Sequence, residues 1–146
     1  MARLRPVLEA FGSVTPVGPL GRGAGAKLVV NSTLGGTLAV LGEALALADG
    51  LGLDPAAAVR VLALSPLGQQ VGRRRAVLDG EEPPLRFRLR LAGKDLDLVR
   101  EAAGEAGVEL RLAPAVGSWL REAAGAGWGE RDYSSVLAYI REAARE

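Results

Sequence analysis

The chain has 146 residues, enough for one domain with a buried core, and its 18 basic and 17 acidic residues leave a net charge of only +1. This balance does not indicate nucleic acid or an anionic membrane as a bulk partner. The sequence contains no cysteine and no histidine, which excludes disulfides, thiol catalysis, Ser-His or Cys-His nucleophiles and the usual zinc sites.

The first 20 residues resemble the end of an α/β unit. Residues 3–11 have the apolar spacing of a short helix, and residues 14–17 form a β-branched run that suits a short strand. No later segment predicts a partner for that strand, and isolated strands are marginal. The breaker cluster at residues 18–23 then predicts a boundary near residue 20, with residues 21–146 as one helical domain.

From about Arg22 to Gly50 the sequence predicts one long helix. It carries a leucine stripe and a second stripe of small residues, which are Gly35, Ala39, Gly42 and Ala46. Each glycine inside a helix costs about 1 kcal/mol relative to alanine, so these residues predict the close approach of another helix. The longest uncharged run, residues 28–42, is shorter than the ~20 residues that a membrane span requires. We therefore expect no membrane segment and, without a signal-peptide pattern, a cytoplasmic protein.

Helix-start signals and apolar periodicity continue through the rest of the chain. Asp54-Pro55 predicts the start of a helix that reaches about Leu64, and Ser65-Pro66 predicts one that reaches about Asp79. Further helices are predicted over 91–106, from Pro114 to the glycine cluster at 125–129, and from Asp132 onward. With aromatic residues at only 4%, we expect an all-α bundle of about six helices in all, organised around the long one.

Lys27 and Asn31 are the most informative polar residues. The chain has only two lysines, Lys27 and Lys94, among its 18 basic residues, and Asn31 is its only asparagine. Unlike arginine, a partly buried lysine can titrate near working pH and pass a proton to a substrate. Spaced by four, Lys27 and Asn31 share a helix face near the N-terminal end, where the helix dipole disfavours a cation. The alternative is an exposed lysine whose stem covers apolar neighbours.

Two other patterns admit competing interpretations. Gly21, Gly23 and Gly25 match a dinucleotide fingerprint only in part, because the third spacing is wrong and no βαβ unit follows. We expect them instead to permit a tight turn and free N–H groups at the helix start, where a carboxylate can dock. The basic run Arg73–Arg75 is either a nucleic-acid patch or, as we favour, a solvated helix face, since it has no interleaved aromatics.

Four groups of residues, taken in chain order, resemble one enzyme family. They are Gly23-x-Gly25-x-Lys27-x-x-x-Asn31, then residues 43–48 with Gly52-Leu53-Asp54, then Lys94-Asp95-Leu96, and last Gly127 with Asp132 and Ser134-Ser135. The pattern resembles the C-terminal half of the β-hydroxyacid dehydrogenases, above all the 3-hydroxyisobutyrate dehydrogenase-like branch. The implied fold is a helical domain like the C-terminal domain of 6-phosphogluconate dehydrogenase. Residues 1–20 would then be a helix-strand remnant of an otherwise missing Rossmann domain.

The resemblance also implies a reaction and the residues that serve it. The family interconverts a hydroxyl and a carbonyl near a carboxylate with NAD or NADP. Lys27 would be the catalytic acid and base, Asn31, Gly23 and Gly25 would bind substrate, and Lys94 would lie near the cofactor; no metal is implied. A truncated chain without the pyrophosphate- and ribose-binding parts is not expected to hold NAD or NADP tightly alone. A dimer through helix 22–50, using its small-residue stripe, and a separate dinucleotide-binding domain are the implied partners.

Three hypotheses follow for function. The first is the substrate-binding and oligomerisation half of such a dehydrogenase, inactive without a cofactor domain. The second is a non-catalytic helical assembly module that retains ancestral residues. The third is nucleic-acid binding through Arg73–Arg75. The sequence does not fix the substrate or the choice between NAD and NADP, because pocket shape and the other domain set these.

Overall fold

The computed structural model describes residues 4–144, and over this range the chain is helical and contains no β-sheet. The one β-type contact among these residues is an isolated antiparallel bridge between Arg88 and Asp132. The elements in order are α1 (Arg5–Glu9), α2 (Arg22–Gly50), α3 (Pro55–Ala63), α4 (Gly68–Arg73), α5 (Arg75–Leu78), α6 (Leu89–Glu105), α7 (Leu112–Ala123), the π-turn η1 (Ala124–Trp128), the 3-10 turn η2 (Tyr133–Ser135) and α8 (Val136–Ala143). The predicted all-α class is confirmed.

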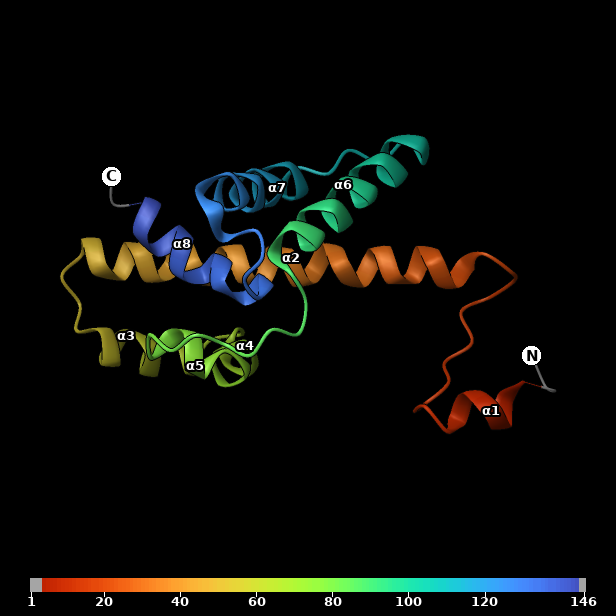
Figure 1. Ribbon diagram of the computed structural model, residues 1–146, viewed down its shortest axis with the longest axis horizontal. Helices are drawn as coiled ribbons and strands as arrows, with labels where there is room; N and C mark the ends of the chain where they lie inside the picture. Colours follow the sequence, from red (N-terminus) through yellow and green to blue (C-terminus); the bar gives the residue numbers. More distant parts are fainter. Residues whose placement is uncertain (1–3, 145–146) are drawn as a thin grey trace.

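Helix α2 forms the axis of the domain. Helices α6, α7 and α8 pack against it, and α3 to α5 run along another side (Figure 1). Three of its leucines, Leu38, Leu41 and Leu45, point into this core and are almost completely buried. They meet Leu89 and Leu96 of α6, Val116 and Leu120 of α7, and Leu137 and Ile140 of α8 in one apolar cluster. The predicted leucine stripe is therefore the inner face of α2.

The small residues of α2 allow other helices to approach closely. A Cβ atom added at Gly35 would lie 3.0 Å from Val116 Cγ1 and 3.1 Å from Leu96 Cδ2. One added at Gly42 would lie 3.0 Å from Ile140 Cβ. The predicted helix–helix approach is thus made by α6, α7 and α8 of the same chain. The glycines of this stripe are covered from within the chain, and a dimer contact through helix 22–50 stays a prediction.

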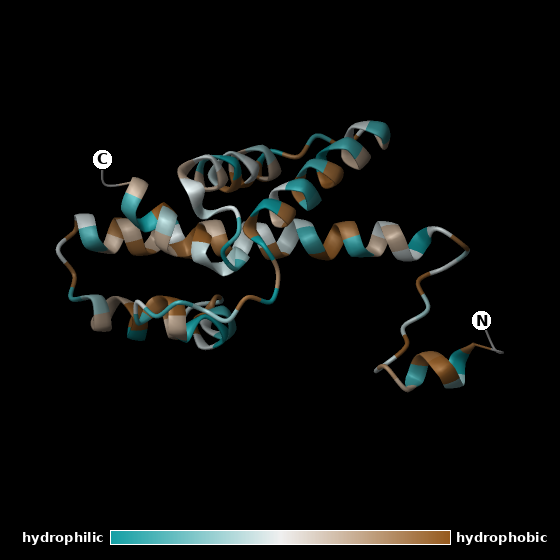
Figure 2. Ribbon diagram, viewed as in Figure 1, coloured by the Kyte–Doolittle hydropathy of each residue, from teal (hydrophilic) through white to brown (hydrophobic). Residues whose placement is uncertain are grey.

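The N-terminal residues lie apart from this core. Helix α1 has no buried residue, and Phe11 just after it is 88% exposed (Figure 1). Its apolar side shows as brown ribbon in Figure 2 with no helix packed against it. Residues 14–17 are unpaired, so the strand suggested there does not form among the described residues. The physical reason is the one visible in the sequence: no edge strand is available to accept its hydrogen bonds.

The segment after α3 departs from its predicted boundaries. Asp54 caps α3 as expected, because its Oδ2 accepts a hydrogen bond from the Ala57 backbone N at 2.8 Å. The next helix does not start at Ser65, whose Oγ accepts instead from the Leu67 N at 3.1 Å in a tight turn. It begins at Gly68 and breaks at Arg74 into α4 and α5. The break coincides with the turn of the Arg74 guanidinium toward the ring of Tyr133.

Helix α2 is also long and apolar enough, by length and composition alone, to cross a membrane. The uncharged run at residues 28–42 is too short to span a membrane. The 18-residue stretch of α2 that meets the membrane criterion is longer because that criterion allows up to two charged residues. Within the chain 28% of that stretch is buried. The central helix of a globular domain passes the same test, and α2 carries Leu41 and Leu45, two of the fully buried side chains of this core. We therefore interpret it as a packing helix.

Candidate active site

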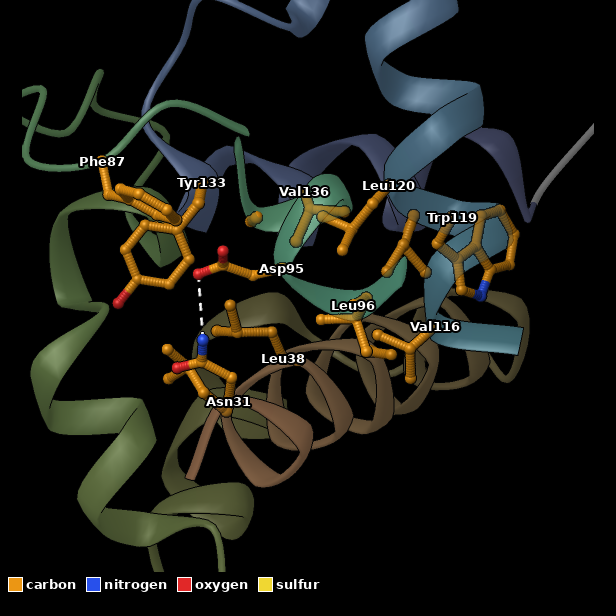
Figure 3. Close-up of a pocket in the computed structure, with 15 residues that line it drawn as sticks. Asn31, Leu38, Phe87, Asp95, Leu96, Val116, Trp119, Leu120, Tyr133 and Val136 are labelled. Atoms are coloured by element: carbon orange, nitrogen blue, oxygen red, sulfur yellow. Dashed lines mark hydrogen bonds between the residues drawn. The ribbon is translucent and has the colours of Figure 1, made fainter. Parts of the chain in front are cut away.

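A hydrogen bond between Asn31 and Asp95 joins two parts of the sequence pattern that are 64 residues apart. Asn31 lies on α2 and Asp95 on the first half of α6, and the Asn31 Nδ2 donates to Asp95 Oδ2 at 2.9 Å (Figure 3). Both side chains are half-buried. The Lys27–Asn31 group and the Lys94-Asp95 group of the sequence thus converge at one place in the fold.

This bond fixes which way the Asn31 amide faces. An ionised carboxylate can only accept hydrogen bonds, so the amide must present its NH₂ group to Asp95. The Asn31 Oδ1 is therefore turned away from Asp95, and it can accept a hydrogen bond from a hydroxyl group. The remaining Asn31 N–H can donate to a carboxylate. A single side chain at this position can therefore bind both oxygen groups of a hydroxy acid.

An apolar cavity of about 40 Å³ begins at the Asn31–Asp95 pair and continues between α2, α6, α7 and α8. Two aromatic side chains, Phe87 and Tyr133, stand beside Asp95 at this end (Figure 3). Their ring centroids are 6.0 Å apart with an interplanar angle of 71°, an edge-to-face arrangement. Trp119 lines the opposite end. Polar groups thus gather at one end of an otherwise hydrophobic cavity.

Asp132 holds the two aromatic residues in place. Its buried carboxylate accepts hydrogen bonds from the backbone N of Arg86 at 2.9 Å, of Phe87 at 3.2 Å and of Ser134 at 3.0 Å, and from Ser134 Oγ at 2.6 Å. Burial alone would raise the pKa of Asp132, but the hydrogen bonds from Ser134, Arg86 and Phe87 outweigh it and hold the pKa below its ordinary value. Asp132, predicted as a helix cap, therefore also links the backbone of residues 86–87 to the turn at residues 132–134 through hydrogen bonds.

Arg74 supports the same aromatic wall from outside the cavity. Its guanidinium carbon lies 4.8 Å from the centroid of the Tyr133 ring, and an Nη2 hydrogen bond reaches the Tyr133 hydroxyl. Arg73 and Arg75 are exposed as predicted, and Arg75 pairs with Asp79 at 2.7 Å. The prediction of a fully solvated basic run is wrong for Arg74, which is half-buried because it packs on Tyr133.

The lysines predicted to act are more exposed than the sequence suggested. Lys27 lies one turn before Asn31 on α2, but its side chain is exposed and makes no hydrogen bond or ion pair with another described residue. The expected partly buried amine is therefore wrong for this chain taken alone, because no described residue covers that end of α2. Lys94 is exposed as well. Asp95, and not Lys94, lines the cavity.

The glycines that precede Lys27 lie in equally open surroundings. Helix α2 starts after Gly21, which has φ of 91°, and Cβ atoms added at Gly21, Gly23 or Gly25 would meet nothing within 4 Å. Packing within the chain does not require glycine at these positions.

The described residues include no group of three acidic side chains arranged to hold a metal ion.

Sequence reasoning missed Asp95 and Tyr133 as members of the site. Asp95 is recognisable in the sequence only as the acid beside Lys94. The convergence of Asp95 and Tyr133 with Asn31 depends on how α6 crosses α2, which no local pattern encodes.

Residues 21–140 match the family model described as "NAD-binding of NADP-dependent 3-hydroxyisobutyrate dehydrogenase". Among curated proteins, the chain is 31% identical over 147 aligned positions to 3-sulfolactaldehyde reductase of Escherichia coli, covering 97% of this chain and 49% of that protein. It is 34% identical to L-threonate dehydrogenase of Haemophilus influenzae, covering 92% and 46%. It is 28% identical to glyoxylate/succinic semialdehyde reductase 1 of Arabidopsis thaliana, covering 86% and 44%.

Solved structures give the same result. A 3-hydroxyisobutyrate dehydrogenase from Salmonella typhimurium superposes with a TM-score of 0.79 at 29% identity, over 94% of this chain and 50% of that one. The Mycobacterium tuberculosis 3-hydroxyisobutyrate dehydrogenase with L-serine gives a TM-score of 0.81 at 25% identity, over 96% and 51%. The chain spans about half the length of the relatives that it matches.

Proposed function

The chain belongs to the 3-hydroxyisobutyrate dehydrogenase-like family of β-hydroxyacid dehydrogenases, and from that premise we propose that it is the C-terminal, substrate-binding and oligomerisation half of such an enzyme. Its span of about half the relatives' length supports this assignment. So does the position of the family match, which starts at residue 21, where the helical body begins. The proposed reaction is the NAD(P)-dependent interconversion of a hydroxyl and a carbonyl in a small acid.

The hydrogen bond between Asn31 and Asp95 is the observation that carries the proposal. It places the only asparagine of the chain at the mouth of an apolar cavity with its amide oriented. In the proposed mechanism Asn31 donates to the substrate carboxylate and accepts from its hydroxyl. Asp95 does not touch the reacting atoms and acts by keeping the Asn31 amide in that orientation.

Lys27 is the proposed acid and base. It lies one turn from Asn31 on the same side of α2, so its amine can take the proton of the substrate hydroxyl during oxidation and return it during reduction. A solvated amine is a poor match for that task, because exclusion of water is what tunes a lysine toward neutral pH. The exposure of Lys27 in this chain is therefore the reason why we propose that the chain is inactive alone.

The residues near Lys94 fit one edge of a nicotinamide dinucleotide. An exposed ammonium group on α6, one residue from Asp95, suits a phosphate or ribose contact, and the start of α2 around Gly23 and Gly25 has open space beside it. The bound cofactor would supply or accept the hydride. The matched family model is described as NAD-binding, whereas the sequence suggested only weak binding by this chain. We propose a partial cofactor site here that another domain completes.

Two partners are proposed. A separate dinucleotide-binding domain would cover α1, whose apolar side chains are exposed, and the open end of α2. A second copy of the chain would pack on the outward side of helix 22–50, which presents Val29, Val40 and Leu47 to solvent. We propose a cytoplasmic location for the assembly, since its relatives are dehydrogenases and reductases of small molecules.

The exposed lysines favour a second candidate function. If no cofactor domain ever covers Lys27 and Lys94, the chain would be a non-catalytic assembly module that keeps the family's residues without using them. Its helical core does not depend on either lysine, because neither contacts another described residue through a hydrogen bond or ion pair.

Reconstitution distinguishes the two candidates. The purified chain would be mixed with a separately produced dinucleotide-binding domain, and oxidation of small β-hydroxy acids followed by NADH or NADPH absorbance. We expect no turnover from the chain alone, turnover from the mixture, and loss of it with Lys27→Ala. Absence of turnover from a mixture in which the two parts demonstrably associate would support the assembly module instead.

A further inference from the structure

A second cavity, of about 200 Å³, lies between α8 and the loop that follows α5. Helices α5 and α8 contact each other beside the second half of α2 (Figure 1). Ala138 and Glu142 of α8 line this cavity, whereas Val136 and Ile140 of the same helix line the cavity beneath Asn31. The two cavities share no lining residue. A molecule in the second cavity would therefore contact a part of the chain that the proposed reaction does not use.

Opposite charges line this cavity without contacting each other. Arg131 is one of its lining residues, and its guanidinium carbon lies 4.0 Å from the centroid of the Trp128 ring. Three carboxylates, which we call the acidic rim, line it as well: Glu81, Glu82 and Glu142. Neither Arg131 nor the acidic rim makes a side-chain hydrogen bond or ion pair with another described residue. Arginine can bind a carboxylate through two parallel N–H hydrogen bonds, so a ligand that carries both a carboxylate and an ammonium group can satisfy both sets of charges.

A buried hydroxyl group lies in the wall of the same cavity. Ser135 lines the cavity and is only 3% exposed, yet its Oγ has no hydrogen-bond partner among the described residues. The adjacent Ser134 Oγ, by contrast, donates to Asp132 Oδ1 at 2.6 Å. A buried hydroxyl without a partner destabilises a fold, and such groups are uncommon in proteins. A polar ligand group in the cavity would supply the missing partner.

The cavity adjoins another one of about 280 Å³ whose walls are mostly hydrocarbon. Four residues line both: Val77, Gly80, Ala138 and Glu142. Beyond them the wall contains Leu78 and the almost completely buried Leu45 and Leu137. Arg141 also lines it, but its guanidinium already donates two hydrogen bonds to Asp49. An aliphatic group that extends from the charged cavity would therefore be buried against apolar surface, which favours its binding.

We propose that the two adjoining cavities form a binding site for a free α-amino acid with an aliphatic side chain. The ligand carboxylate binds Arg131, its ammonium group binds the acidic rim, and Ser135 hydrogen-bonds to one of these groups. The side chain lies against Leu45 and Leu137. A simple acid would leave the acidic rim without a partner, and a simple amine would leave Arg131 without one. The proposal goes beyond the proposed function and does not depend on it, because none of these residues lines the cavity at Asn31.

The test compares L-leucine with two analogues that each lack one charge. 4-Methylpentanoate lacks the ammonium group, and 3-methylbutylamine lacks the carboxylate. The chain, labelled with ¹⁵N at its two tryptophans, would be titrated with each compound, and dissociation constants read from the indole signal of Trp128, which lines the site. Trp119, which lines the other cavity, is the internal reference. We expect leucine to bind about tenfold more tightly than either analogue, the gain typical of a hydrogen bond to a charged group.

Charge-removing variants assign the two polar contacts. Arg131→Gln should make leucine bind no more tightly than 3-methylbutylamine, and Arg111→Gln, an exposed arginine outside the site, is its control. Glutamine at all three positions of the acidic rim should remove the preference for leucine over 4-methylpentanoate. The matched control places glutamine at three other exposed glutamates that make no side-chain hydrogen bond or ion pair with described residues: Glu101, Glu105 and Glu122.

A third variant tests the apolar part of the site. Ala138→Val adds bulk where the two cavities meet and should weaken leucine binding while glycine binding stays unchanged. Ala143→Val, at a half-buried position of the same helix that lines neither cavity, is the control. If Ala138→Val fails to fold, the parent chain still decides the question, since leucine should bind it at least tenfold more tightly than glycine.

Each contrary result overturns a defined part of the proposal. Equal binding of leucine and 3-methylbutylamine to the parent chain overturns the contact with Arg131, and equal binding of leucine and 4-methylpentanoate overturns the role of the acidic rim; either one overturns an amino acid as the ligand. A shift of Trp119 without one of Trp128 overturns the location. Absence of any shift at millimolar leucine overturns the site. The proposed function stands in every case, because reconstitution tests it separately.

Discussion

The two ends of helix α2 differ in almost every physical respect. From Leu38 onward its inner face is packed by α6, α7 and α8, and its leucines there are nearly inaccessible to solvent. Before Asn31 the helix is mostly open: Lys27 is exposed, Val29 is 67% exposed, and Cβ atoms added at Gly23 or Gly25 would meet nothing within 4 Å, although Leu28 still packs against the core. We call α2 from Leu38 onward, together with the helices packed around it, the closed half of the chain. The residues of α2 before Asn31, which carry the proposed chemistry, form the open half.

This difference separates residues kept for stability from residues kept for activity. Substitutions of buried residues after Leu38 should lower the free energy of unfolding, whereas substitutions before Asn31 should leave the packing of the core intact and change chiefly what the chain does with a partner.

The largest effect is expected for Lys27→Ala in the reconstituted enzyme. Removal of a general acid and base costs about 10²- to 10⁴-fold in turnover, while the unfolding midpoint should stay unchanged because the side chain is exposed and makes no hydrogen bond or ion pair with described residues. Lys27→Arg should be nearly as inactive, since arginine keeps its proton. Arg22→Ala, another exposed cation on α2, is the control. Activity retained by Lys27→Arg would show that charge alone is required.

Leu41→Ala should have the largest effect on stability. Leu41 has no accessible surface in the core of α2, and truncation of such a residue costs about 2–5 kcal/mol because a cavity remains. The matched change in the open half is Val29→Ala, which we expect to stay within about 0.5 kcal/mol of the parent chain. Urea denaturation followed by circular dichroism measures both. Comparable losses for the two variants would mean that the open half is packed in solution, as a second copy would pack it.

Local signals predicted the closed half better than the open one. The leucine stripe, the Asp54 cap and the all-α class follow from spacing and capping chemistry within a few residues, and all are present. The Asn31–Asp95 bond depends on a contact across 64 residues, so no local pattern encodes it. A helical stripe shows that Lys27 and Asn31 share a face, but it does not tell how much of that face is covered. That is why the burial of Lys27 was predicted wrongly.

Two glycines of α2 should respond to alanine with opposite signs. Gly42→Ala drives a methyl group to 3.0 Å from Ile140 Cβ, and such overpacking costs about 1–3 kcal/mol. Gly25→Ala meets no atom within 4 Å and should stabilise the helix by about 0.5–1 kcal/mol. The pair is measured by thermal unfolding at one pH. If Gly25→Ala also abolishes reconstituted turnover while it stabilises the chain, then this glycine serves a ligand or partner and not the fold.

The smallest expected effect is a dependence of the unfolding temperature on pH, and it arises at the buried residue Asp132. Because hydrogen bonds hold the pKa of Asp132 below its ordinary value, the ionised carboxylate stabilises the folded chain at every pH above about 4, the ordinary pKa of an aspartate. That contribution disappears as the pH falls through the lowered pKa of the folded state, since the unfolded chain takes up the proton first. Thermal unfolding of the parent chain should therefore steepen in its pH dependence below pH 4. Asp132→Asn should be less stable at neutral pH and show a flatter acid limb. If the stability of Asp132→Asn fell with acid as it does in the parent chain, other carboxylates would be responsible for the acid sensitivity. Residues 86–87 would then be anchored by hydrogen bonds that do not need the charge of Asp132.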